Sequence, residues 1–186
     1  MPAPPILSTS SPTDISSTCS AYSLTPSEFI ALQTKATASK SSAYCPYSNF
    51  HVGCCLLTTS GAYITGANVE NASYPVTTCA ERVALGKAIT DGHRGFKAVA
   101  VATDISPPAS PCGMCRQFIR EFCALITPII MFDGSGGYSV LRLEEVSCLC
   151  EVCVAGLIKL RDDSCCRCRS GRNRSVLRHR PQVVKI

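Results

Sequence analysis

The sequence contains no tryptophan, and only 17% of its 186 residues are charged. Its uninterrupted apolar runs are only a few residues long, which excludes a membrane-spanning helix. The first 34 residues contain neither Lys nor Arg and no continuous apolar stretch, so we expect neither a secretory signal nor a transit peptide. An apolar fraction of 46% excludes a wholly disordered chain. These absences predict a globular protein in the cytoplasm, without a membrane partner.

Cysteine is the one residue type present in excess, with 14 copies. In the absence of an export signal, cysteines are expected to be thiols and metal ligands rather than a disulfide framework.

Positive charge is confined to the end of the chain. Residues 1–160 hold 10 Lys and Arg against 11 Asp and Glu, whereas residues 161–186 hold 8 against 2. The first 160 residues therefore have no charge excess that would favour nucleic-acid binding.

The N-terminal segment is rich in polar residues and proline. Residues 1–27 include eight Ser, four Thr and five Pro. Such a composition buries too little apolar surface to offset the entropy of ordering, so we predict that residues 1–25 are a disordered leader. Thr25, Pro26 and Glu28 have the spacing of a capping box and predict the start of the first helix.

Five strands and two further helices are predicted after that helix. The strands are expected over 52–59, 62–68, 97–103, 129–132 and 138–143, and the helices begin near Thr78 and at Ser110. This order predicts an α/β fold with a mixed five-stranded sheet between helices, which is a three-layer α-β-α sandwich.

Two short segments carry the residues of a metal site. Cys79 begins the second predicted helix, and Cys112 and Cys115 lie three residues apart at the start of the third. Helix N-termini favour thiolates, and three thiolates leave the fourth position of a tetrahedral zinc ion open, as in catalytic sites. Glu81 can reach that position without being a ligand. This Cys-x-Glu followed by Pro-Cys-x-x-Cys is the three-cysteine form of the zinc deaminase signature.

Two further segments extend this pattern, Ser42–Gly53 and Gly66–Pro75. With the zinc segments, they make residues 26–145 resemble the small homotetrameric cytidine deaminases of the cytidine and deoxycytidylate deaminase superfamily. The resemblance implies one zinc ion per chain and Glu81 as the catalytic acid and base. It also implies contacts to the nucleoside from the ring of Phe50, the ribose-binding Asn68 and Glu70, the backbone amide of Ala80, and Tyr74 across a subunit boundary.

Two arginines adjoin the predicted site, Arg82 after Glu81 and Arg116 after Cys115. The resemblance implies that both donate to thiolate sulfur and so moderate the negative charge of the three cysteines. The activity that it implies is hydrolytic deamination of cytidine and deoxycytidine to uridine and deoxyuridine, a step of pyrimidine salvage.

Residues 146–186 depart from that family and are predicted to be an atypical, disordered tail rich in Cys and Arg. They could be a second zinc module, a nucleic-acid or nuclear-import patch, or a non-native extension such as translated intron sequence. No Phe follows Phe132, although the family has one near its C-terminus that reaches a neighbouring active site. The tail therefore puts the homotetramer in doubt.

Two alternative functions remain open from the sequence. One is deamination of another cytosine nucleoside, such as a nucleoside antibiotic, at the same zinc site. The other is an inactive zinc-binding protein whose basic tail binds nucleic acid. Polynucleotide deamination is disfavoured because the predicted core lacks both Trp and a basic groove for a strand.

Overall fold

Six strands form one mixed sheet in the computed structural model, which describes residues 4–146. The predicted tail from residue 147 onward lies outside the described residues. The strands are β1 (Leu7–Ser8), β2 (Gly53–Thr58), β3 (Tyr63–Ala67), β4 (Phe96–Ala102), β5 (Pro128–Phe132) and β6 (Gly137–Arg142). Their spatial order is β1-β6-β5-β4-β2-β3, in which β4 and β5 run parallel and all other neighbours antiparallel.

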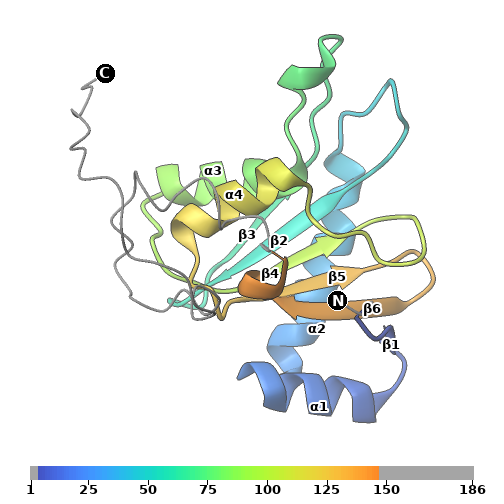
Figure 1. The fold of residues 1–186 in the computed structure, drawn as a ribbon, viewed down its shortest axis with the longest axis vertical. Helices are drawn as coiled ribbons and strands as arrows, with labels where there is room; N and C mark the ends of the chain where they lie inside the picture. Colours follow the sequence, from blue (N-terminus) through green and yellow to red (C-terminus); the bar gives the residue numbers. More distant parts are fainter. Residues whose placement is uncertain (1–3, 147–186) are drawn as a thin grey trace, which may run out of the picture. The chain divides into compact units, whose positions relative to one another are not determined.

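Helices cover both faces of this sheet (Figure 1). Helices α1 (Pro12–Tyr22) and α2 (Pro26–Ser39) pack on one face, and α3 (Ala80–Thr90), α4 (Gly113–Phe122) and α5 (Leu143–Val146) on the other. Two 3₁₀ turns, η1 (Lys40–Ser42) and η2 (Tyr74–Val76), complete the regular elements. Among the described residues, no helix has the length and apolar character needed to cross a membrane.

The alternation of side chains along β2 explains the two cores. Cys54 and Leu56 point into the core beneath α3 and α4, whereas Cys55 and Leu57 point into the core beneath α1 and α2. All six residues of β2 are buried. The predicted α/β class and its layered arrangement are therefore present, but the prediction of five strands is wrong because β1 adds a sixth.

The predicted disordered leader is wrong for residues 7–8 and 12–22, which form β1 and α1. Ser11 caps α1 by accepting the Asp14 N–H, and β1 pairs with β6. The helix is weakly amphipathic, but its few apolar residues share one face, which packs on the sheet, and Cys19 is buried there. Composition alone overlooks this stabilisation, because it comes from the local Ser11 cap and from tertiary packing on the sheet, which residue content does not reveal.

The predicted start of α2 is confirmed, and that of α4 is displaced. Thr25 and Glu28 form the complete capping box, with Pro26 as the first helical residue. The residue before α4 is Cys112 rather than the predicted Ser110. The Ser110 hydroxyl instead accepts a hydrogen bond from Arg116, at 2.8 Å, so it does not cap the helix.

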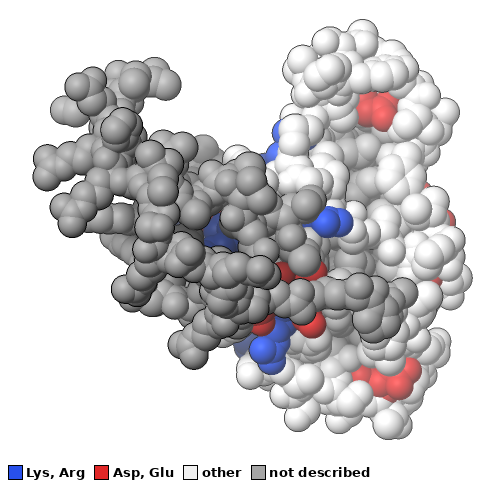
Figure 2. Space-filling model, in the orientation of Figure 1, with Lys and Arg blue, Asp and Glu red and all other residues white. Residues whose placement is uncertain are grey.

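Charged side chains are thinly distributed over the face shown in Figure 2. Within the described residues visible there, Lys and Arg occur singly or in small groups among neutral side chains. The described residues that are visible in this view therefore form no continuous basic strip.

Candidate active site

Three cysteines that are distant in the sequence meet at the beginnings of two helices. Cys79 immediately precedes α3, Cys112 immediately precedes α4, and Cys115 lies in the first turn of α4. Their sulfur atoms all lie within 4.8 Å of one another, and those of Cys79 and Cys112 are 3.8 Å apart. The structure therefore brings together the three residues that the sequence assigns to zinc.

Charge at this cluster is distributed unequally. The neighbouring Cys115 thiol, assisted by the Arg82 guanidinium, lowers the pKa of the Cys79 thiol. The proximity of Cys79, together with burial, raises the pKa of Cys115. Cys79 is thus more readily deprotonated than Cys115, and a cation at the cluster would favour the thiolate form of all three cysteines.

The donor set fits zinc. Two sulfur ligands at about 2.3 Å from a tetrahedral zinc lie roughly 3.8 Å apart, as the Cys79 and Cys112 sulfurs do. Three thiolates leave one of four positions for a further ligand, which is the arrangement of catalytic rather than structural zinc sites.

Glu81 lies in the first turn of α3, two residues after Cys79. Only 4% of its surface is exposed, and this burial raises the pKa of its carboxyl group. Raising the pKa of a carboxyl group brings it closer to neutral pH, and a group with such a pKa can both accept and return a proton. Glu81 therefore has the environment of a general acid and base beside the cysteine cluster.

The two arginines hold different groups. Arg82 donates to the backbone oxygen of Thr77, at 2.7 Å, and contacts the Cys79 sulfur, at 3.8 Å. Arg116 donates to the oxygen of Pro111, at 2.7 Å, and to Ser110. Arg82 thus has the predicted contact to sulfur, whereas Arg116 fixes the loop that leads into Cys112.

A second group of polar side chains adjoins the start of α3. Val69 forms isolated bridges with both Tyr44 and Thr78, with Val69 and Thr78 exchanging two hydrogen bonds of 2.9 Å. These bridges tie three segments together: the loop of residues 44–52, the end of β3, and the residues that lead into Cys79. Asn68 and Glu70 flank Val69 and so lie next to the bridge to Thr78, the residue that precedes Cys79.

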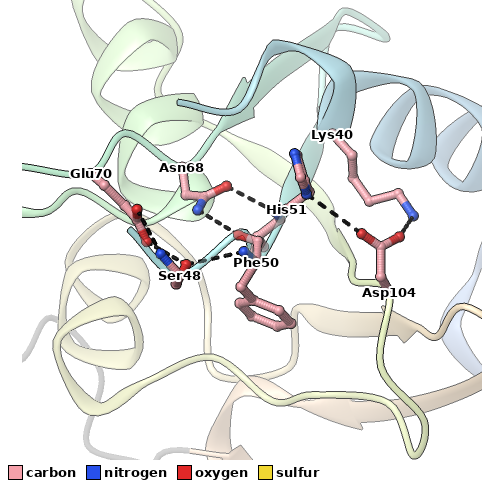
Figure 3. Close-up of polar contacts among 8 residues, drawn as sticks. Lys40, Ser48, Phe50, His51, Asn68, Glu70 and Asp104 are labelled. Atoms are coloured by element: carbon pink, nitrogen blue, oxygen red, sulfur yellow. Dashed lines mark hydrogen bonds and ion pairs between the residues drawn. The ribbon is translucent and has the colours of Figure 1, made fainter. Parts of the chain in front are cut away.

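Asn68 and Glu70 both bind the 44–52 loop (Figure 3). The Asn68 Oδ1 accepts the Val52 N–H at 2.9 Å, and its Nδ2 donates to the Phe50 oxygen at 2.8 Å. Each of these amide atoms keeps one further hydrogen-bonding position. Glu70 accepts hydrogen bonds from residues 47 and 48 of the loop. Hydrogen bonds to its charged form lower the pKa of Glu70, the Ser48 hydroxyl contributing most.

The other predicted nucleoside contacts differ in exposure. Phe50 is half-buried and follows Asn49, which has the positive φ of 54° that Asn tolerates. Ala80 is fully buried, and as the first residue of α3 its N–H belongs to those without an intrahelical partner. Tyr74 is 70% exposed, and its ring lies 5.9 Å from that of Tyr47.

Sequence reasoning missed the residues that support the 44–52 loop. Ser48 hydrogen-bonds both Glu70 and the Phe50 N–H. The second bond could have been anticipated from the sequence, because a Ser side chain often accepts the backbone N–H two residues later. Asp104, after β4, pairs with Lys40 at 2.6 Å and lies 3.9 Å from the His51 Nδ1. No sequence signal pointed to the pairing of Lys40 with Asp104, because the two residues are 64 positions apart.

Comparison with known proteins gives a consistent result. Residues 27–131 match the family described as "Cytidine and deoxycytidylate deaminase zinc-binding region". The cytidine deaminase of Sporosarcina psychrophila is 50% identical over 94 residues, which are 50% of this chain and 69% of that protein. The cytidine deaminase of Halalkalibacterium halodurans is 43% identical over 112 residues, 60% of this chain and 85% of that protein.

A solved structure and a deaminase with another name extend the comparison. The crystal structure of cytidine deaminase from Burkholderia pseudomallei is 40% identical and covers 62% of this chain and 93% of its own, with a TM-score of 0.61. The blasticidin-S deaminase of Bacillus cereus is 34% identical over 92 residues, 45% of this chain and 66% of that protein.

Proposed function

Because the chain belongs to the cytidine and deoxycytidylate deaminase family, we propose that it hydrolyses cytidine and deoxycytidine to uridine and deoxyuridine with zinc, as in pyrimidine salvage. The observation that carries this proposal is the buried Glu81 beside three converging sulfurs. Matches at 50% and 43% identity to proteins named cytidine deaminase support the substrate class.

The residues divide the chemistry among themselves. Cys79, Cys112 and Cys115 would hold the zinc ion, which when bound acts as a Lewis acid that makes water a nucleophile near neutral pH. Glu81 takes the proton of the attacking water and delivers it to N3 of the cytosine ring, so that C4 becomes electrophilic. The water oxygen then bonds to C4, and its second proton passes through the Glu81 carboxyl group to the amine. The C4–N bond breaks, ammonia leaves, and C4 becomes the carbonyl carbon of uridine.

The remaining residues orient the nucleoside. The edge of the base is held by the free N–H of Ala80 and by the Glu81 carboxylate. The Phe50 ring packs against the pyrimidine ring. Asn68 and Glu70 present unused hydrogen-bonding positions that suit ribose hydroxyls. Tyr74, which is exposed here, approaches the nucleoside of a neighbouring subunit.

We also propose that residues 26–145 form the deaminase domain and that it assembles as a homotetramer. The surface of α4 supports an assembly, because a groove of about 530 Å³ there is lined by Met114, Phe118 and Phe122. Met114 is 57% exposed in the single chain. A cytoplasmic location belongs to the same proposal, since the eight described cysteines are free thiols.

The decisive experiment compares the Glu81→Gln variant with the unaltered protein. Conversion of cytidine to uridine is followed by the fall in absorbance near the cytosine maximum. Glu81→Gln should lose at least about 10²–10⁴-fold in kcat, because it removes the general acid and base, while zinc content stays the same. Glu144→Gln, which alters a partly exposed glutamate on α5, is the matched control. Full activity of Glu81→Gln would contradict the mechanism.

A second candidate substrate is a cytosine nucleoside antibiotic. The match to blasticidin-S deaminase at 34% identity favours including it. Parallel kinetics with cytidine, deoxycytidine and blasticidin S distinguish the two proposals. The proposed function requires a higher kcat/KM for cytidine than for the antibiotic.

A further inference from the structure

The Glu70 carboxylate is held by two consecutive residues of the 44–52 loop. Its Oε2 accepts the backbone N–H groups of Tyr47, at 2.9 Å, and of Ser48, at 3.3 Å. Its Oε1 accepts the hydroxyl of Ser48. Figure 3 shows Ser48 between Glu70 and Phe50. The Ser48 hydroxyl is therefore the side-chain contact that fixes the rotation of the carboxylate about its terminal bond.

The same hydroxyl also binds the backbone of Phe50. The Phe50 N–H donates to the Ser48 Oγ at 3.0 Å. A carboxylate can only accept, and a serine hydroxyl has one proton, so that proton is directed to Glu70 and the oxygen lone pair to Phe50. One hydroxyl thus links the residue proposed to bind ribose with the residue proposed to pack on the base.

Counting acceptor positions shows what this link leaves available. A carboxylate oxygen has about two lone-pair positions. Both positions of the Glu70 Oε2 are taken by backbone N–H groups, whereas Oε1 has one donor, Ser48. The free position for a ribose hydroxyl is therefore on Oε1, and its direction depends on where Ser48 holds that oxygen.

We propose that Ser48 is a positioning residue for the nucleoside: its hydroxyl orients the Glu70 carboxylate toward the ribose hydroxyls and links that carboxylate to the Phe50 backbone. This inference rests on the proposed function. Ser48 does not touch the reacting atoms in this arrangement and acts through Glu70.

The loop has independent anchors, which separates positioning from folding. Asn68 binds the loop at Phe50 and Val52, and these two hydrogen bonds do not involve Ser48. Ser48 is exposed, so its truncation to alanine leaves no buried cavity. A Ser48→Ala protein should therefore have the thermal stability of the unaltered protein and differ from it in substrate binding.

The test is steady-state kinetics of Ser48→Ala with two substrates, cytidine and 2′,3′-dideoxycytidine, which lacks the hydroxyls that Glu70 would contact. For cytidine we expect KM to rise about tenfold, the usual order for a lost hydrogen bond to a charged group, with kcat within about twofold. For the dideoxy substrate, KM should be the same in both proteins. Ser48→Thr, which keeps the hydroxyl, should restore the KM for cytidine.

A matched control is Ser41→Ala. Ser41 is another exposed serine, and its hydroxyl donates to the backbone oxygen of Ala38, away from Glu70. If Ser48→Ala does not fold, Ser48→Cys provides the test, since it keeps the size but donates weakly, and it should raise KM for cytidine alone.

An unchanged KM for cytidine, or an equal rise for both substrates, would overturn the inference and leave the proposed function intact. Failure of the unaltered protein to deaminate cytidine would overturn the proposed function, and the inference with it.

Discussion

Replacing Gly66 with alanine should disturb the active site through the packing of β3 on α3. A Cβ atom at Gly66 would lie 2.5 Å from the Ala84 nitrogen and 2.8 Å from the Ala80 oxygen. Both are backbone atoms, so the helix must move by about 0.5–1 Å to reach ordinary contact distances. Overpacking of this kind costs about 1–3 kcal/mol. The displaced end of α3 is the one that carries Cys79 and Glu81.

Gly86→Ala is the matched control for Gly66→Ala. Gly86 lies inside α3, and a Cβ there would meet no atom within 4 Å. Because alanine loses less backbone entropy than glycine in a helix, Gly86→Ala should stabilise the protein by about 0.5–1 kcal/mol. The two variants thus make the same chemical change and are expected to have opposite effects on stability.

Thermal unfolding, zinc content and cytidine kinetics should be measured on both variants. For a domain of this size, 1 kcal/mol corresponds to about 2–4 °C in Tm. We expect Gly66→Ala to melt at a lower temperature, to retain less zinc and to have a reduced kcat/KM, and Gly86→Ala to melt at a higher temperature with unchanged kinetics. A Gly66→Ala protein with normal Tm, zinc and kinetics would refute the claim that this contact positions the site.

Two further predictions concern an ion pair and a ligand. Glu28 accepts a hydrogen bond of 2.8 Å from Lys97, and this bond lowers the pKa of Glu28. The pair therefore stabilises the fold fully at pH values above the ordinary glutamate pKa of about 4.3. This stabilisation is lost as the pH falls through the lowered pKa. Glu28→Gln keeps the capping capacity of the side chain. Denaturant titrations should show that the free energy of unfolding falls by up to about 1 kcal/mol at pH 7 and that this difference vanishes in acid. A difference independent of pH would contradict the charge argument. Cys115→Ser should retain less than the full zinc content by metal analysis, and a chelator should lower the Tm of the unaltered protein but leave that of the variant nearly unchanged. Full zinc content in Cys115→Ser would remove Cys115 from the ligand set.

The features that could be predicted from the sequence are those that local chemistry determines. The capping box of Thr25 and Glu28 starts α2 where its residue types require, because each of the two side chains bonds a backbone group three residues away. The cysteine cluster was predictable for a related reason. Cys79 and Cys112 each lie directly before a helix, and this position directs both sulfurs to one place once the helices pack side by side.

The features that could not be predicted depend on partners far along the chain. Helix α1 is held by the hydrogen bond between Thr18 and Tyr138, at 2.9 Å, and by the burial of Cys19 against the sheet. Neither contact leaves a pattern within residues 1–25, whose composition alone indicates disorder. The strand β1 is similarly invisible, because two residues carry no periodicity and their pairing is provided by β6.

The candidate ribose site shows the same division within a single segment. Asn68 and Glu70 are two residues apart, and the alternation of an extended chain predicts that both can serve one ligand. The sequence does not show that each is already engaged by the 44–52 loop, since those bonds span 16 to 23 residues. This engagement changes how both residues must be interpreted, because each keeps only part of its hydrogen-bonding capacity for a ligand. Substrate affinity should therefore depend on the loop as much as on the two residues themselves, which is why Ser48, an exposed serine with no chemistry of its own, is the most informative position to alter.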